Sequence, residues 1–399
     1  MKKTIFAVMA MALVALAAGC SKDHQPGQPI SHLVHQDWSV DVRDGLNCFM
    51  DDCAGMQNAY VVFDFDNTTS IFDVEEQLAI YQLETMSFAL DPEQLPKVLA
   101  TGLNDTPDQC AWISDISSAY SKLYTAYGPF TPKGLSESML DTVHSDPQWL
   151  EFATKMRAMY DKVGEWASID DSYNWILYWF CGMTEKEVYD IAYASHKKYS
   201  AVNTSVETWT SPSGLGSSVG QVSVSWTKGV QVSENIRELW KCLDENGIDV
   251  WVCSASATDP IRAAIDVWGL HDYCTGMLAM TNVLDENGKY VNAYDYENGC
   301  GWYARSGGEW EKMTAPEKAQ TQGVGKVEAI TNAIAPEYEN HGPIAGFMDS
   351  TGDYNFCTEF DTLKLVIESK SEEEKEFYEM RGDYLLQKAQ KKAIAENRV

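Results

Sequence analysis

Two aspartates, Asp64 and Asp66, directly follow the apolar run 60–63, which is rich in β-branched and aromatic residues. Such a run predicts a buried strand. The chain turns just past the end of a strand, so both carboxylates can reach one pocket. Burying two like charges together is costly unless a cation or a shared proton compensates them. The pair therefore predicts metal binding, acid–base chemistry or both, and the alternative is two solvated aspartates at an exposed strand end.

A hydroxyl and an amine stand at comparable places later in the chain. Ser254 ends the apolar run 248–254, and Lys326 lies at the start of an expected helix. A hydroxyl with free backbone N–H groups at a strand-to-helix turn can bind phosphate. Lys312 and Lys318 are rivals to Lys326, which is preferred because its helix leads into the next expected strand.

A third apolar run, 343–349, ends in Asp349, and Asp353 follows on a short loop. The order of these signals, beginning with D-x-D-x-T and ending with D-S-x-x-D, resembles the four motifs of the haloacid dehalogenase (HAD) superfamily. Met348 departs from the pattern, because that family usually has glycine there. The resemblance implies a phosphatase, since an aspartate at position 66 is typical of that branch.

The resemblance also implies a role for each motif residue. Asp64 would attack phosphorus to form an aspartyl-phosphate, and Asp66 would act as general acid and then as general base. Ser254 would bind the phosphoryl oxygens, and Lys326 would offset negative charge. The residues implied for a Mg2+ site are Asp64, Asp66 through its backbone carbonyl, Asp349, and Asp353, which would position Lys326 or a metal-bound water.

The elements needed to position these residues predict an α/β fold. Strands separated by helices, each with its polar residues at the carboxyl end, indicate a doubly wound parallel sheet, the Rossmann-like core of the HAD family. The core is expected to comprise 35–79 and 233–399. Residues 80–232 are expected to form a large, mostly helical type 1 cap between the first and second motifs, with a hairpin over 206–226. The charged segment 371–399 is expected to be a helical tail.

Candidate substrate-binding residues come from both parts. Asp73 lies nine residues after Asp64, where phosphoserine phosphatases of the superfamily carry an acidic residue, but D-x-x-E also predicts a helix cap there. Ala255 lies in the expected phosphate-binding turn. Trp175 and Trp179 belong to an aromatic run that could bind a quaternary ammonium group or simply pack in the cap. This branch also includes phosphorylcholine phosphatases.

The amino-terminal residues resemble a bacterial lipoprotein leader. Residues 1–19 have a basic start and an apolar middle, and Cys20 would be the acylated residue, followed by a tether over 20–34. Plain secretion is the alternative. The chain is therefore expected in the cell envelope, at the outer membrane on its periplasmic or outer face. In an exported protein, Cys48 with Cys53 and Cys274 with Cys300 are candidate disulfides.

The net charge of the chain bears on which partners are expected. The chain has 399 residues and a net charge of −29, so nucleic acid is not an expected partner. The resemblance, together with the expected export and the aromatic residues of the cap, implies a Mg2+-dependent phosphomonoester hydrolase acting on a small amine-bearing substrate such as phosphocholine or phosphoethanolamine. The alternatives are a broad-specificity exported acid-type phosphatase and a catalytically idle HAD-fold surface lipoprotein that binds a ligand.

Overall fold

The computed structural model describes residues 28–295, 301–306, 308–314, 320–353, 355, 359–360, 363–368 and 384–388. Cys20 and the expected leader lie outside these residues. Within them, no helix combines the length and the apolar character needed to cross a membrane.

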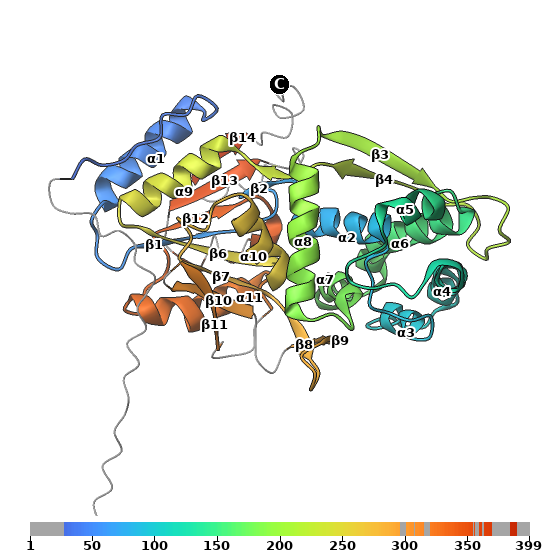
Figure 1. Ribbon diagram of the computed structural model, residues 1–399. Helices are drawn as coiled ribbons and strands as arrows, with labels where there is room; N and C mark the ends of the chain where they lie inside the picture. Colours follow the sequence, from blue (N-terminus) through green and yellow to red (C-terminus); the bar gives the residue numbers. More distant parts are fainter. Residues whose placement is uncertain are drawn as a thin grey trace, which may run out of the picture.

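A mostly parallel central sheet organises the fold (Figure 1). Its six parallel strands run in the order β7-β6-β1-β12-β13-β14, and two antiparallel strands, β10 and β11, extend it beyond β7. The fold class is therefore the expected α/β arrangement. In sheet order the bounds are β11 Glu309–Met313, β10 Gly301–Ser306, β7 Gly276–Met280, β6 Asp249–Ala257, β1 Tyr60–Phe63, β12 Ala345–Met348, β13 Leu363–Glu368 and β14 Tyr384–Lys388.

Strand β1 lies between β6 and β12 in the middle of the sheet, and all four of its residues are buried. Its alternating side chains serve both faces of the sheet. Val61 and Phe63 pack in one cluster with helices α1 (Val40–Cys53), α9 (Glu234–Glu245) and α10 (Thr258–Val267). Tyr60 and Val62 pack in another cluster, on the side of helix α11 (Val324–Ala329) and the turns that continue it, 330–338. Helices thus cover both faces, as a doubly wound sheet requires.

Register places the carboxyl ends of β1 and β12 together. Phe63 is opposite Phe347, and the two rings stack with centroids 3.9 Å apart. The backbone N–H of Asp64 donates to the Phe347 carbonyl over 2.8 Å. Asp64 and Asp349 therefore leave the sheet at the same edge.

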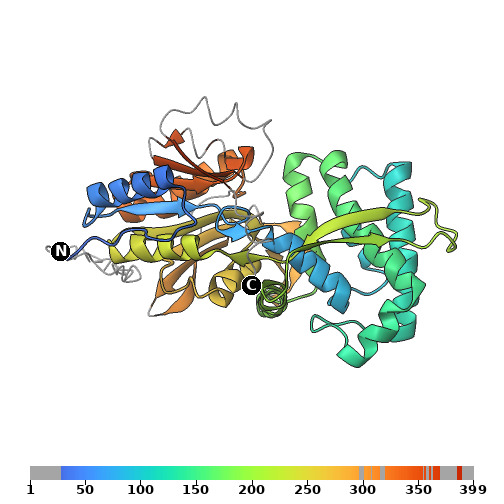
Figure 2. The same cartoon turned by 90° about the horizontal axis from the view of Figure 1, so that it is seen from above.

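A second lobe, rich in helices, lies beside the sheet (Figure 2). Its apolar cluster also includes Leu78 and Tyr290, which lie outside the expected cap limits of 80 and 232. Strands β3 and β4 form the expected antiparallel hairpin. The elements are α2 Val74–Thr85, α3 Leu95–Leu99, α4 Pro107–Tyr127, α5 Glu137–His144, α6 Pro147–Trp166, α7 Ile169–Leu177, η1 Tyr178–Phe180, α8 Glu185–Ser200, β3 Ser205–Thr210 and β4 Ser223–Lys228, with short pairs β2 Ser70–Ile71/β5 Gln231–Val232 and β8 Asn282–Leu284/β9 Tyr290–Tyr294.

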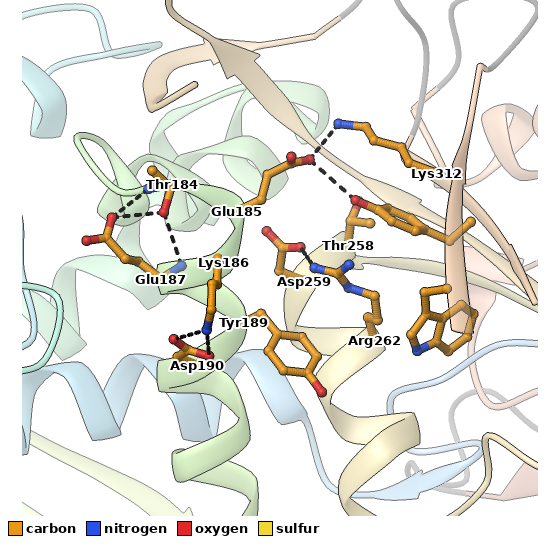
Figure 3. Close-up of polar contacts among 12 residues, drawn as sticks. Thr184, Glu185, Lys186, Glu187, Tyr189, Asp190, Thr258, Asp259, Arg262 and Lys312 are labelled. Atoms are coloured by element: carbon orange, nitrogen blue, oxygen red, sulfur yellow. Dashed lines mark hydrogen bonds and ion pairs between the residues drawn. The ribbon is translucent and has the colours of Figure 1, made fainter. Parts of the chain in front are cut away.

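Helix α8 joins this lobe to the core through polar contacts (Figure 3). Glu185, at its first turn, pairs with Lys312 of β11 at 2.5 Å. Asp259 and Arg262 of α10 pair at 2.7 Å, and the Arg262 guanidinium lies over the Tyr189 ring of α8 at 5.0 Å from its centroid. Together with the packing of α8 along α10, these contacts fix α8 on the core.

Two sequence expectations were wrong. Residues 384–388, expected within a helical tail, form strand β14 and pair in parallel with β13. The many charged residues of the tail suggested a helix, whereas the short apolar group containing Leu385 packs on α1 beside Gly45. Cys48 and Cys53 are free thiols; Cys300 lies outside the described residues, so its expected bridge is not described either.

Candidate active site

Three motif residues meet at the carboxyl edge of the sheet. Lys326 Nζ lies 2.6 Å from Asp64 Oδ1 and 2.6 Å from Asp353 Oδ1. The Lys326 side chain is almost completely buried. Burial opposes its charge, but Asp353 and Asp64 outweigh that effect and raise the pKa of Lys326 well above its usual value. The amine therefore stays charged and holds both carboxylates.

The local sequence explains how Lys326 reaches this place. Gly323 has φ +52° at the start of α11, and its N–H donates to the carbonyl of Gly352 in the loop that carries Asp353. A Cβ on Gly325 would lie 1.7 Å from the Gln320 carbonyl oxygen, so this turn needs glycine. Lys312, the rival candidate, pairs with Glu185 instead, and Lys318 lies outside the described residues.

The cluster fits a hard divalent cation. Asp64, Asp349 and Asp353 each offer a carboxylate oxygen, and these oxygens lie within 4.8 Å of one another. Oxygen ligands of this kind suit Mg2+. Three carboxyl groups face one ammonium group, so part of their negative charge is left uncompensated. As one consequence, burial and the neighbouring Asp64 raise the pKa of Asp353 to about 6. A bound cation would relieve this excess charge.

Asp66 is directed elsewhere. Its Oδ1 accepts from the Val74 N–H at 2.7 Å, and its Oδ2 accepts from Ser256 Oγ at 2.6 Å. Burial, followed by the charge of Asp73, raises the pKa of Asp66 well above its usual value. The Asp66 carboxylate is thus not among the clustered metal-ligand candidates, while its expected contact through the backbone carbonyl remains a prediction.

Threonines after the two aspartates fix Asp64. Thr68 Oγ1 donates to Asp64 Oδ2 at 3.0 Å, and Thr69 Oγ1 donates to the Asp64 carbonyl at 2.8 Å. Asn67 adopts φ +61°, which turns the chain sharply after Asp66. With one oxygen held by Thr68 and the other by Lys326, the Asp64 carboxylate has a fixed orientation.

A cavity of about 370 Å³ opens over these residues and reaches the helical lobe. Asp64, Asp66, Lys326, Asp349 and Asp353 all line it. Helices α6 and α7 supply its opposite wall through Tyr160, Asp161, Gly164, Ser172, Tyr173 and Ile176. The two lobes therefore form one site.

Two of the four expected substrate-binding residues reach this cavity. Asp73 and Ala255 line it. Asp73 also caps α2, because its carboxylate accepts from the N–H groups of Glu75 and Glu76.

The other two, Trp175 and Trp179, do not line the cavity. Each is 1% exposed in the apolar cluster of the helical lobe. Their rings meet edge to face, and Trp175 Nε1 donates to the Leu99 carbonyl. The helical period points Tyr173 and Ile176 to the cavity instead, so the aromatic run mainly builds the lobe's core.

Ser254, which was expected to bind the phosphoryl oxygens, does not reach the cavity either. It is fully buried and is not among the residues that line the cavity. Its Oγ accepts from the Ser256 N–H at 3.1 Å, and its carbonyl accepts from Thr321 Oγ1. In this structure Ser254 supports the turn, and Ser256 presents the hydroxyl to the cavity.

The sequence reasoning missed several cavity residues, among them Ser256, Glu75 and Tyr160. Ser256 follows Ser254 at a spacing of two and was visible as part of Ser-Ala-Ser. Glu75 lies in the D-x-E-E run, and burial, followed by the charge of Asp73, raises its pKa to about 8. No local signal marked Tyr160, which comes from the middle of a long helix.

Comparison with solved structures supports the fold. The structure is similar to a conserved protein of unknown function from Anaerococcus prevotii DSM 20548, with a TM-score of 0.73 and 25% identity over 89% of this chain and 94% of that one. The fold is thus shared along nearly the whole of both chains.

Two further similarities have lower scores. A protein of unknown function from Bordetella pertussis Tohama I has a TM-score of 0.42 and 11% identity, covering 82% of this chain and 97% of that one. Cytosolic 5'-nucleotidase IIIB bound to cytidine has a TM-score of 0.35 and 12% identity, covering 89% and 90%. No family model matches the chain, and no curated protein matches it significantly.

Proposed function

We propose that this protein is a Mg2+-dependent phosphomonoester hydrolase that works through an aspartyl-phosphate. One observation carries the proposal: the Asp64 carboxylate, at the end of the central strand, is held 2.6 Å from the Lys326 amine beside Asp349 and Asp353. A nucleophile, a charged amine and a set of hard oxygen ligands are what phosphoryl transfer requires.

The proposed reaction has two steps. Asp64 attacks phosphorus, the ester P–O bond breaks with its electron pair moving to the leaving oxygen, and Asp66 gives that oxygen its proton. Water then attacks phosphorus and passes a proton to Asp66, while the P–O bond to Asp64 breaks and releases inorganic phosphate. Asp64, Asp349 and Asp353 would hold Mg2+, which supplies positive charge for the phosphoryl oxygens. Lys326 keeps Asp64 oriented throughout.

The proposed substrate is a small phosphomonoester with an amine, such as phosphocholine or phosphoethanolamine. Beyond the phosphoryl position the cavity is lined by the acidic side chains of Asp73, Glu75 and Asp161 and by Tyr160. Among the described residues that line it, Lys326 is the only basic one. Such a wall favours a positively charged leaving group. Broad specificity remains the rival, with the wall serving other alcohols equally.

The proposal includes export. Residues 1–19 would be removed and Cys20 would carry a lipid, so that the site works in the cell envelope. The basic start, the apolar middle and the small residues before Cys20 support this.

The test is Mg2+-dependent phosphate release by the full chain in mild detergent. The panel contains phosphocholine, phosphoethanolamine, phosphoserine, sugar phosphates and p-nitrophenyl phosphate. Asp64→Asn should lower release by about 10³-fold or more, because an amide cannot form the phosphorylated intermediate. The matched control is Asp272→Asn, an exposed aspartate with a 70% exposed side chain that does not line the cavity.

The outcomes separate the alternatives. Preference for the amine-bearing substrates supports the acidic wall as a specificity feature. Equal rates across the panel would support a phosphatase of broad specificity and contradict a preference for amine-bearing substrates. Release that does not depend on Asp64, or no release from any compound, contradicts the proposed function and favours a ligand-binding lipoprotein.

A further inference from the structure

Ser256 makes a short contact with the second aspartate of the site. Its Oγ lies 2.6 Å from Asp66 Oδ2, and the side chain, 5% exposed, lies at the carboxyl end of β6. The hydroxyl carries the proton in this contact, so Ser256 donates and the carboxyl oxygen accepts. This contact joins the end of β6 to the turn after β1.

The other oxygen of Asp66 is held from a different element. The N–H of Val74, the first residue of α2, donates to Asp66 Oδ1 at 2.7 Å. Two donors from two elements therefore fix the plane of one carboxyl group. Rotating that group toward any other orientation would break at least one of these hydrogen bonds.

Ser256 is itself held in place. Its N–H donates to Ser254 Oγ at 3.1 Å, and the next residue along the chain is held by Glu75. The Glu75 carboxyl accepts from the N–H of Ala257 at 3.2 Å. The backbone that carries the Ser256 hydroxyl is thus held at two consecutive residues, which is what a group that orients another side chain requires.

We infer that Ser256 is a positioning residue that aims the Asp66 carboxyl at the leaving oxygen. The inference rests on the proposed function, in which Asp66 gives its proton to that oxygen as the P–O bond breaks. Ser256 itself exchanges no proton with the substrate. Its hydrogen bond limits the orientations of Asp66, and misplacing a catalytic group by a small distance lowers the rate strongly.

This role predicts an effect that depends on the leaving group. An alkoxide is strongly basic and needs the proton of Asp66, whereas p-nitrophenolate is a weak base that can leave without it. Losing the Ser256 hydroxyl should therefore slow the hydrolysis of alkyl phosphates far more than that of p-nitrophenyl phosphate. A role only in folding or in phosphate binding would affect both substrates alike.

The experiment measures kcat/KM of the full chain with Mg2+ on n-butyl phosphate and on p-nitrophenyl phosphate. The parameter kcat/KM includes the step in which the ester bond breaks. For Ser256→Ala we expect a fall of about 30-fold or more on the alkyl substrate and of less than about 3-fold on the aryl one. Both are measured on one preparation, so their ratio does not depend on the fraction folded.

Two further variants sharpen the test. Ser256→Thr keeps a hydroxyl and should keep the ratio within about 3-fold of the original. Ser195→Ala is the matched control, because Ser195 is fully buried and its Oγ makes no hydrogen bond to the described part of the chain; its ratio should not change.

Three results would overturn the inference. Equal falls on the two substrates would assign Ser256 to folding or binding, and no fall would remove any role. Both leave the proposed function standing, because the unchanged protein still hydrolyses phosphomonoesters. If the unchanged protein hydrolyses neither substrate, the proposed function fails and this inference fails with it.

Discussion

At the scale of single residues, the site depends on charges that balance only in combination. Lys326 lies between Asp64 and Asp353, and the side chains of all three are shielded from water. A buried pair of opposite charges adds little net stability when complete, but removing one partner leaves the other uncompensated. The ammonium of Lys326 is thus needed for the fold as well as for the proposed chemistry.

Lys326→Met should lower the free energy of unfolding by about 3 kcal/mol or more, because two buried carboxylates lose their cation. The measurement is denaturant unfolding with EDTA present, so that added metal does not replace the amine. Lys312→Met is the matched control: that lysine is 50% exposed in its pair with Glu185 and should cost less than about 1 kcal/mol. Equal small losses in the two variants would contradict this account.

The residues of the site could be predicted from sequence where position along a strand decides their place. Asp64 and Asp349 follow apolar runs, and parallel strands bring their ends to one edge. The cavity side of the helical lobe could not be predicted in this way. A helical period shows which residues share a face, but not whether that face meets the core or the cavity, so the sequence alone left open whether Trp175 and Trp179 bind substrate or pack in the cap.

Ser254 and Ser256 show a related limit. They lie two residues apart, so a strand period gives them the same face. Which hydroxyl reaches the rim depends on how far β6 extends, and the strand continues to Ala257. The sequence suggested that the strand ends at Ser254, whereas it continues for three more residues and Ser256 is the serine that lines the cavity.

At the scale of elements, the contact between α8 and α10 includes a buried histidine. His196 of α8 is completely buried, with Nε2 3.0 Å from the Pro260 carbonyl and its ring stacked on Trp268. Burial lowers the pKa of His196 from 6.5 to about 4, against a smaller opposing effect of that hydrogen bond. Because the folded chain resists this protonation, the stability present above pH 6.5 is lost as the pH falls toward 4.

The expected loss from His196 at pH 5 is roughly 2 kcal/mol relative to pH 7. His196→Gln keeps an amide that can donate to Pro260 but removes the titration, so its stability should fall less between the two pH values. Denaturant unfolding at pH 7 and pH 5 measures the difference. His32→Gln, at a 41% exposed side chain, should retain the fall of the unchanged protein. An undiminished fall in His196→Gln would disprove the assignment.

Secondary structure was easier to predict than the extent of the helical lobe. The hairpin over 206–226 follows from local periods and turn residues, and it is confirmed. Packing between lobes has no such local signal. The contacts of α8 with α10 join residues far apart in sequence, and only the folded chain shows them.

At the scale of the whole molecule, the first helix and the last described strand pack together. Leu385 of β14 lies against Gly45 of α1, within the cluster that also contains Val61 and Phe63. Strand β14 is therefore part of the core. The sequence did not indicate this strand, because the segment 371–399 is rich in charged residues and its apolar group around Leu385 is short.

Leu385→Ala should lower the free energy of unfolding by about 1–2 kcal/mol, since a partly buried leucine loses its apolar contacts with α1. Thermal or denaturant unfolding measures the loss. Val206→Ala, at a 72% exposed position on β3, should change stability by less than about 0.5 kcal/mol. A Leu385 variant as stable as the Val206 variant would show that β14 does not support the core.

The strand order of the sheet also determines when the acidic cluster can form during synthesis of the chain. Asp64 is made early by the ribosome, but strand β1 lies between β6 and β12, and Asp349 and Asp353 follow β12 near the end of the chain. The acidic cluster therefore cannot form until the chain has been made through Asp353. On the proposed export route, the polypeptide would pass through a translocon before its nucleophile, its lysine and its metal ligands had met, and hydrolysis would begin only after the last strands had crossed.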